Sequence, residues 1–553
     1  MSKNLSALSF RKGTEKNVFE RMVDEAGKAG TAETPTFVRP MGESSLFGDA
    51  ITLGAVSFYD FLKKENEGKK VFLCNGSACL CAGTQDKLHH QIAESFPEEE
   101  IGHICCLGRC HEGAAFQYQG QNYSGLSDQA LDHLFTTGVG DGEDRYAVVS
   151  HLQPPQLTAP FPGIEAYYAP FRELLGKDRD AVLVDLKDSG LRGRGGAGFP
   201  MHFKWQSCRT AEGKVKYIVC NADEGDPGAY VDKYLMEKQP HSVLLGMMVA
   251  GWFAGAETGV LYIRAEYPDS VRIINEAIAD LLEAGLLGHD ILGSGFNFKF
   301  KTIKGAGAYI CGEETALLSS IEGQRPEVRT RPPFPTIEGL FRKPTIVNNV
   351  ETFSNIRAIL TMGGKGYAAI GTPQSTGPKL LSLDSHFAKP GIYEVAMGTP
   401  LRTVIDLAGG FKTDIKAIQI GGPLGGIVPV THIDQLTVDF ESFKKAGFLL
   451  GHAGVVSIPR VFPMIEYIQH LFQFTADESC GKCFPCRLGS TRCKELIAKA
   501  REDSTFKIDR TLITDLLDTM EQTSLCALGG GVPLPIKNAL QYFGEEMKPY
   551  FEG

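Results

Sequence analysis

The sequence predicts a multidomain protein of the α/β class, and three observations carry this prediction. The chain has 553 residues, which favours three or four domains over one. Apolar segments typical of strands alternate with segments of helical spacing along most of it. Gly-rich breaks at 136–144 and 371–378 divide the chain. With 43% hydrophobic and 22% charged residues, the composition is that of an ordinary soluble globular protein.

Charge and cysteine content restrict the function further. The formal net charge of -10, without a long Lys/Arg block, argues against a nucleic-acid partner. The N-terminus lacks the apolar run of a secretory signal, so the 14 cysteines indicate a reducing cytoplasm. The longest apolar stretch, 243–256, is too short to span a bilayer and predicts a buried helix. Any association with a membrane is expected to occur through partners.

The first part of the chain predicts a small α/β unit. Residues 1–50 read as a polar extension, and a compact unit follows at 51–140. The compact unit shows a strand, a helix, a strand and a hairpin in this order, at 70–74, 86–95, 100–106 and 114–123.

The rest of the chain predicts three further regions. The first, 147–372, is a larger α/β region with strand candidates at 217–220 and 260–264. The second, 379–440, is rich in strands. Helical periodicity dominates from Pro463, and we take 455–553 as a helical domain.

The C-terminal region carries the most informative motif. Three cysteines lie in E-S-C-G-K-C-F-P-C-R-L-G, at Cys480, Cys483 and Cys486, and Cys526 follows much later. Three thiolates in one tight turn plus one remote cysteine is the usual way to hold a [4Fe–4S] cluster. Structural zinc is the alternative, but C-x2-C-x2-C is uncommon for zinc. Cys493 also lies near, but Cys526 precedes the loop A-L-G-G-G and is the predicted fourth ligand.

A second cysteine group lies in the small N-terminal unit. Each of its two pairs follows a predicted strand, so that two loops converge on one site. The pairs have the spacings C-x4-C and C-x3-C, at Cys74, Cys79, Cys106 and Cys110. Four thiolates suit a [2Fe–2S] cluster or structural zinc, and the absence of C-x2-C pairs favours the cluster. Cys81 and Cys105 break the spacing and are taken as bystanders.

A glycine-rich segment at 190–200, G-L-R-G-R-G-G-A-G-F-P, indicates a phosphate-binding loop. It contains G-x-G-x-x-G, but a helical segment precedes it, so it is not an ordinary dinucleotide-binding fingerprint. Glycines allow the backbone to approach phosphates closely. A flexible turn is the alternative. Positive charge is expected from Arg192, Arg194 and Lys204.

Two further segments supply polar side chains. The strand ending at Cys220 delivers Asn221, Asp223, Glu224 and Asp226 into a loop, which is where α/β sheets bind ligands. The alternative is an acidic, solvated turn. In 305–318 glycines precede a helix predicted to start near Glu313, where an anion binds readily. Glu313 and Glu314 would oppose a phosphate there, so we expect them to contact hydroxyl or amide groups.

These strings together resemble the NADH-binding flavoprotein of respiratory complex I and its relatives in NAD-linked hydrogenases and formate dehydrogenases. The match covers about 147–553 and rests on G-R-G-G-A-G-F-P, N-A-D-E-G-D-P-G, G-A-Y-I-C-G-E-E-T-A-L and E-S-C-G-K-C-x-P-C-R-x-G in the family's order. The resemblance implies FMN, NAD(H) and a [4Fe–4S] cluster in one chain. It also implies a Rossmann-like FMN/NAD domain, a ubiquitin-like β-grasp (SLBB-like) insert at 379–440 and a helical cluster domain.

By the same resemblance, residues in these motifs are expected to bind the cofactors. The expected FMN residues are Gly193, Gly195, Gly196, Lys204, Asn221, Asp223, Glu224, Gly312, Glu313, Asn348 and Asn349, with Arg194 beside them. The expected NAD(H) residues are Phe199, Asp226, Glu314, Arg331 and Phe334. The chain departs from some members at Ser207, where an aromatic residue is expected, at Asp226, which replaces a glutamate, and at Arg331, which replaces a lysine.

The N-terminal unit resembles the thioredoxin-like [2Fe–2S] protein that accompanies this flavoprotein. The string L-G-A-V-S-F-Y-D-F-L and the cysteine spacing both match. The two proteins would here be fused into one chain. The helical lead-in usual for that [2Fe–2S] protein is shortened.

The predicted function is that of a diaphorase subunit in a multisubunit oxidoreductase. Hydride passes between NAD(H) and FMN, and single electrons pass between FMN and the clusters; the cofactor carries the chemistry, so no catalytic acid or base is expected. Lys204 is expected to stabilise reduced flavin. The expected partners are iron–sulfur subunits and a hydrogenase, formate dehydrogenase or quinone-reducing module. The alternatives are an electron-bifurcating component that uses ferredoxin and a zinc-stapled nucleotide-binding scaffold. Carboxylates near the ribose favour NAD over NADP, whereas the arginines at 325–331 suit either nucleotide.

Overall fold

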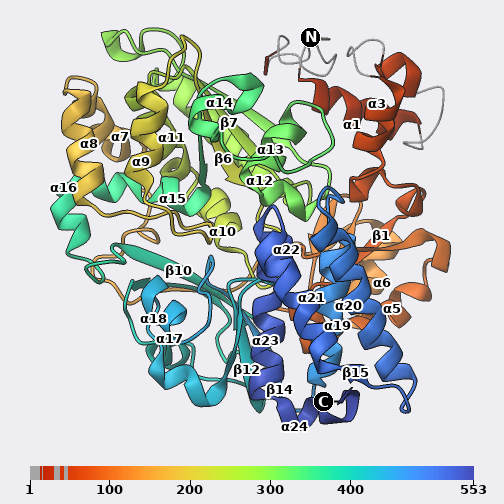
Figure 1. The fold of residues 1–553 in the computed structure, drawn as a ribbon. Helices are drawn as coiled ribbons and strands as arrows, with labels where there is room; N and C mark the ends of the chain where they lie inside the picture. The colour runs from red at the N-terminus through yellow and green to blue at the C-terminus, as the bar shows by residue number, and fades with distance from the viewer. Residues whose placement is uncertain (1–12, 15–16, 30–37, 43–47, 553) are drawn as a thin grey trace.

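The structure, a computed structural model, describes residues 13–14, 17–29, 38–42 and 48–552 (Figure 1). These residues form three larger sheets with their associated helices, followed by a C-terminal group of helices. The structure therefore has the mixed α/β multidomain architecture predicted from the sequence. In the described part of the chain, no helix is both long and apolar enough to cross a membrane.

The central region is built on a parallel four-stranded sheet in the order β8-β7-β6-β9. Its strands are β6 (Tyr217–Ala222), β7 (Thr258–Ile263), β8 (Lys299–Lys304) and β9 (Thr345–Asn349). Alternate residues of β6 enter two different cores, Ile218 on one face and Val219 on the other. Both faces are covered, as a parallel sheet requires.

Helices surround this sheet. The predicted buried helix is α11 (Pro240–Ala254), whose residues after Pro240 are all buried. The other helices of the region are α7 (Ile164–Leu174), α8 (Arg179–Asp188), α9 (Met201–Thr210), α10 (Val231–Lys238), α12 (Pro268–Glu283), α13 (Glu314–Ile321), α14 (Pro335–Glu338), α15 (Val350–Ser354) and α16 (Ile356–Ala368).

The second sheet has six strands in the order β13-β12-β14-β10-β11-β5. They are β5 (Ala147–Ser150), β10 (Pro378–Leu383), β11 (Gly391–Ala396), β12 (Ile415–Ile420), β13 (Gly426–Pro429) and β14 (Gly454–Pro459), with α17 (Leu401–Leu407) and α18 (Phe440–Lys445). This sheet extends beyond the residues 379–440 predicted to be rich in strands, because β5 and β14 also belong to it. Residues 147–150 fall within the predicted region 147–372, but they form β5, which pairs with β11.

The N-terminal unit has the predicted order of elements. Its sheet runs β2-β1-β3-β4, with β1 parallel to β2 and antiparallel to β3. Its elements are β1 (Val71–Cys74), α4 (Ser77–Ala82), α5 (Gln85–Ala93), β2 (Ile101–Ile104), β3 (Phe116–Tyr118), β4 (Gln121–Tyr123) and α6 (Asp128–Thr137).

The first 50 residues contain more structure than a polar extension. The parts of this extension at 1–12, 15–16, 30–37 and 43–47 lie outside the described residues, but α1 (Val18–Ala29) is a helix, and α3 (Asp49–Val56) follows. Phe19 of α1 is fully buried against Tyr59, with ring centroids 5.3 Å apart. Asn17 Nδ2 donates to the carbonyl oxygen of Ile321, 3.0 Å away. The described part of this segment therefore packs against the central region.

The C-terminal region is helical, as predicted. It contains α19 (Met464–Asp477), α20 (Phe484–Glu502), α21 (Arg510–Thr523), α22 (Ala527–Gly531), α23 (Pro533–Tyr542) and α24 (Gly544–Met547), and β15 (Ile508–Asp509) pairs with β16 (Phe551–Glu552). Figure 1 shows these helices in blue beside the orange N-terminal unit. A cleft of about 880 Å³ lies between α19 and β2.

Candidate functional site

The candidate site lies where β6 and β9 end. Asn221 of β6 is paired in register with Asn349 of β9. The chain runs from β6 to β7 to β8 on one side and then returns to β9 on the other side of β6. Ligands of open α/β sheets bind at such a reversal of strand order, outside the carboxyl ends of the strands.

The glycine-rich loop lies directly over the end of β9. A Cβ atom on Gly195 would be 2.9 Å from the Cβ of Asn349, so a side chain does not fit there. Gly196 has φ +114°, which other residues rarely adopt. The loop is closed by a hydrogen bond from the Gly193 amide to the Phe199 carbonyl oxygen, 2.9 Å. The glycines thus bring bare backbone to the end of β9 at the candidate site.

A second wall is formed by the loop after β6 and by η6 (Tyr309–Gly312). Asn221 Nδ2 donates to the Gly312 carbonyl oxygen at 2.7 Å. Two atoms here, Asp223 Oδ2 and Asn348 Oδ1, are buried without a hydrogen-bond partner among the described residues. Burial raises the pKa of Asp223 well above its usual value. Unpaired buried polar atoms beside a glycine-lined backbone suit a polar ring with hydroxylated and phosphorylated arms, such as FMN.

Three charged side chains form a row beside this wall. Glu314 lies between two cations, with 2.7 Å from Oε2 to Lys204 Nζ and 2.7 Å from Oε1 to Arg331 Nη1. Burial alone would raise the pKa of Glu314, but the two cations outweigh it and lower the pKa. Lys204 is therefore paired with a carboxylate beside the candidate site.

Arg194 does not face the site, and its assignment to cofactor binding is wrong. Its guanidinium is fully buried and donates to Thr376 O at 2.5 Å, Met397 Sδ at 2.9 Å and Tyr367 Oη at 3.3 Å. Arg192 is also turned away and pairs with Glu441 at 2.5 Å. Both arginines tie the glycine loop to residues around the six-stranded sheet, so two of the three expected cations do not reach the site.

Several expected ligands are used as helix caps. Glu224 accepts from the amides of Asp232 and Lys233 at the start of α10, at 2.9 and 3.0 Å. Glu313 caps α13 and Asn349 caps α15 in the same manner. These side chains hold three helix N-termini around the site. The position of Glu313 and of Asn349 just before a helical segment was the sequence signal that could have predicted their capping role.

Exposed aromatic rings mark the outer rim. Phe199, Phe203 and Phe334 are 50%, 56% and 55% exposed. The rings of Phe199 and Phe203 are 6.4 Å apart, and Phe334 precedes α14, which is bonded to α9 through Thr336 and Ser207 (2.9 Å). Phe203 is missing from the residues predicted from the sequence. Its signal was an apolar residue on the polar face of α9.

The C-terminal cysteines come from two segments that the structure brings together. Cys486 lies in the first turn of α20, and Cys526 is the N-cap residue of α22. A Cβ on Gly529 would be 2.6 Å from Cys486 Cβ, so the loop carrying Cys526 rests against the cysteine turn. Burial is the main cause that raises the pKa of Cys526 to about 12, and the nearby thiols of Cys486 and Cys480 add to it. Cys483 packs on the same core, whereas Cys493 is buried in another.

The N-terminal cysteines also gather at one place. Cys106 Sγ and Cys110 Sγ are 3.6 Å apart. A hydrogen bond from Cys79, with amides of Gly76, Leu107 and Cys106, lowers the pKa of Cys74 to about 6 despite burial. The Gly228 amide donates to Cys110 Sγ at 3.2 Å. Amide donors around clustered thiolates are typical of iron–sulfur sites.

The described residues contain no group of three or more His, Cys, Asp or Glu side chains arranged to hold a single metal ion.

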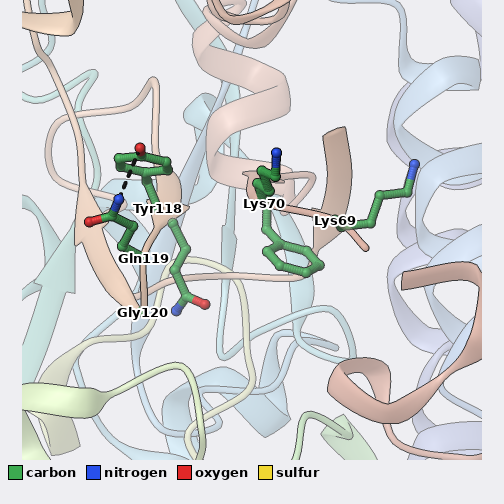
Figure 2. Close-up of a pocket in the computed structure, with 7 residues that line it drawn as sticks. Lys69, Lys70, Tyr118, Gln119 and Gly120 are labelled. Atoms are coloured by element: carbon green, nitrogen blue, oxygen red, sulfur yellow. Dashed lines mark hydrogen bonds between the residues drawn. The ribbon is translucent and has the colours of Figure 1, made fainter. Parts of the chain in front are cut away.

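A further cavity of about 340 Å³ lies where β1 begins and β3 ends in the N-terminal sheet (Figure 2). Lys69, Lys70, Tyr118, Gln119 and Gly120 line it, and none of the predicted site residues does. It is not part of the candidate site.

Fold and site together define a flavin- and iron–sulfur-binding oxidoreductase, and the matches to known protein families agree. Residues 186–358 match the Nuo51 FMN-binding domain, 466–550 the NADH-ubiquinone oxidoreductase-F iron-sulfur binding region, and 386–428 the SLBB domain.

Similar proteins specify the family. The chain is 43% identical over 376 residues to NADP-reducing hydrogenase subunit HndC of Solidesulfovibrio fructosivorans, covering 67% of this chain and 76% of the relative. It is 40% identical to an NADH-quinone oxidoreductase chain of Rhizobium meliloti, covering 70% and 92%. An NAD+-reducing [NiFe]-hydrogenase structure in the H2-reduced state is similar with a TM-score of 0.84 and 26% identity, covering 96% and 93%. The chain belongs to the family of NADH-binding FMN and [4Fe–4S] subunits of NADH-quinone oxidoreductases and NAD-reducing hydrogenases. It is an oxidoreductase of the NADH dehydrogenase type.

Proposed function

We propose that this chain is the diaphorase subunit of a hetero-oligomeric redox complex whose other subunits hold iron–sulfur centres and a hydrogenase, formate dehydrogenase or quinone-reducing module. One observation carries the proposal. Tyr309 belongs to η6, which forms a wall of the candidate flavin site, and its amide donates to the carboxylate of Glu478, 2.9 Å away. Glu478 lies two residues before Cys480, so the C-terminal cysteine turn packs directly on that wall.

The residues present fit FMN. The glycine loop, Asn221, Asp223 and Asn348 would hold it, with bare backbone toward the phosphate and the unpaired Asn348 and Asp223 atoms toward the polar parts of the flavin. When bound, FMN supplies the exchange between a hydride and single electrons. Glu314, Arg331 and Asp226 would orient NAD(H), and Phe199 and Phe334 would contact its adenine. The exposed Phe203 is placed to replace the aromatic residue missing at Ser207.

We also propose fold types for the N-terminal unit and for the region of the six-stranded sheet. The parallel β1–β2 pair followed by the β3–β4 hairpin supports a thioredoxin-like [2Fe–2S] domain. The mixed sheet with a single helix after β11 and the SLBB match support a β-grasp insert. We assign the protein to the cytoplasm, with association to a membrane through partner subunits.

The purified complex tests this function. We expect one FMN per chain, iron and acid-labile sulfide, and NADH:ferricyanide activity that exceeds the activity with NADPH. In the Cys526→Ser variant the [4Fe–4S] signal in electron paramagnetic resonance should be lost, whereas Cys493→Ser should retain it. Protein that contains zinc and neither flavin nor iron would overturn the proposal.

A further inference from the structure

His452 reaches out of the six-stranded sheet region into the loop after β6. It lies in the turn before β14, and its Nε2 is 2.5 Å from Asp226 Oδ2. Tyr309 Oη donates to the other carboxylate oxygen, Oδ1, also at 2.5 Å. The side chains of His452 and Asp226 are only 14% and 17% exposed. Asp226 is therefore held from two sides by residues of two different regions.

The backbone closes a third side. A Cβ on Gly422 would be 2.4 Å from Asp226 Cγ, so only glycine leaves room for the carboxylate there. A carboxylate oxygen accepts two hydrogen bonds. With one position on each oxygen used by the protein, each oxygen keeps one acceptor position for a ligand.

The hydrogen bonds of His452 define where its proton lies. The Gly454 amide donates to Nδ1 at 3.1 Å, so Nδ1 carries no proton in this arrangement. The ring proton is then on Nε2, and Nε2 makes a close ionic contact with Asp226 Oδ2 that is not an aligned hydrogen bond. Burial disfavours the charged ring, but Asp226, with Glu224 behind it, outweighs burial and the charge of Lys379 and raises the pKa of His452. Charging the ring would require a proton at Nδ1 and loss of the Gly454 bond.

We propose that His452 is a positioning residue of the NAD(H) site: the close contact of its Nε2 with Asp226, together with the hydrogen bond from Tyr309, holds the carboxylate in the orientation that accepts a hydrogen bond from a ribose hydroxyl or the carboxamide of the dinucleotide. This inference rests on the proposed function. Asp226 has a shorter side chain than glutamate, so its carboxylate has less reach, and an added donor from the sheet region fixes it where it is needed.

Two variants of His452 separate positioning from packing. Glutamine places an amide N–H near the position of Nε2, whereas phenylalanine keeps the volume and removes the donor. We expect the dissociation constant of NAD+, measured by calorimetry on the purified complex, to rise about tenfold in His452→Phe, as for loss of a polar contact with a charged group. His452→Gln should stay within about threefold of wild type. The KM for NADH should follow the dissociation constant, and kcat should fall much less.

A second route covers the case that His452→Phe does not fold. Tyr309→Phe removes the other bond to Asp226 and should weaken NAD+ binding by a similar factor. FMN content and iron content, measured on each variant, report whether the site is intact.

The outcomes are distinct. Wild-type NAD+ affinity in both His452→Phe and Tyr309→Phe, with FMN present, would overturn the inference and leave the proposed function standing. Equal loss of affinity in His452→Gln and His452→Phe would overturn it as well, because the loss would then come from changed packing and not from the missing polar contact. A wild-type protein that binds neither FMN nor NAD(H) would overturn the proposed function itself.

Discussion

Gly246→Ala should damage the flavin site from a distance, because α11 and α15 touch at this glycine. A Cβ at 246 would be 2.2 Å from the Phe353 carbonyl oxygen and 2.7 Å from its carbon. Ordinary contact begins at 3.4 Å, so the two backbones must move apart by about 1 Å, since neither atom can rotate away. Ser242 Oγ and Ser354 Oγ, 2.9 Å apart, tie the same two helices and would be strained by this movement.

The cost follows from overpacking. Forced insertion into a packed core costs up to about 3 kcal/mol, and the gain in helix propensity from Gly to Ala returns about 1 kcal/mol. The net loss of about 2 kcal/mol lowers the melting midpoint of a region of this size by roughly 4–8 °C. α15 begins at its cap Asn349, which lies under the glycine loop, so FMN content should fall too.

A matched substitution serves as the control. Gly54 lies inside α3, where a Cβ would meet nothing within 4 Å. Gly54→Ala should leave FMN content unchanged and stabilise slightly, by about 0.5–1 kcal/mol. The two measurements are the thermal midpoint and FMN per chain. Equal midpoints and equal FMN content in Gly246→Ala and wild type would refute the packing argument.

Three further predictions concern other parts of the chain. Cys110→Ser should remove the [2Fe–2S] signal in electron paramagnetic resonance, whereas Cys81→Ser should keep it; loss in both would contradict the ligand set. Burial lowers the pKa of His470 to about 4, below its unfolded pKa of about 6.5. The contribution of the neutral ring to the free energy of unfolding is therefore complete above about pH 6.5, and up to about 3 kcal/mol of it is lost as pH falls toward 4. His470→Phe should therefore flatten the fall of the melting midpoint between pH 7 and 5, and an unchanged slope would refute this. Arg194→Met should lower the midpoint while NAD+ affinity is retained, whereas Arg331→Met should weaken NAD+ binding at an unchanged midpoint; the reverse pattern would contradict the assigned contacts.

The sequence predicted the elements of this protein better than it predicted their long-range pairing. The strands at Tyr217 and Thr258 and the helix α11 carry their own apolar patterns, so local reasoning found them. The sequence of β5 does not indicate which strand it pairs with. Its partner β11 lies far along the chain, and Ala147 pairs with Gly391. Only the assembled sheet decides that pairing.

The same limit applies to the site. Motif position assigns Arg194, Glu224 and Asn349 to segments that surround the candidate site, but it does not predict the direction of their side chains. Arg194 turns away because Thr376 and Tyr367 offer it partners from distant segments. Glu224 and Asn349 are drawn to unpaired amides at the starts of helices. His452 lies in none of the recognised motifs, and only its contact with Asp226 identifies it as a candidate site residue.

The loop after β6 links all parts of the proposed electron path. Asn221 bonds to the Gly312 carbonyl beside the candidate flavin site, Asp226 is held by Tyr309, and Gly228 donates to Cys110 Sγ. Tyr309 in turn binds the segment before Cys480 through Glu478. The end of β6 and the short loop after it thus contact the flavin site, the N-terminal cysteines and the neighbour of the C-terminal cysteines. Because hydrogen bonds to sulfur help to set cluster potentials, a substitution in this loop should shift cluster behaviour as well as nucleotide binding, whereas a substitution in the equally acidic but distant turn at 98–100 should change neither.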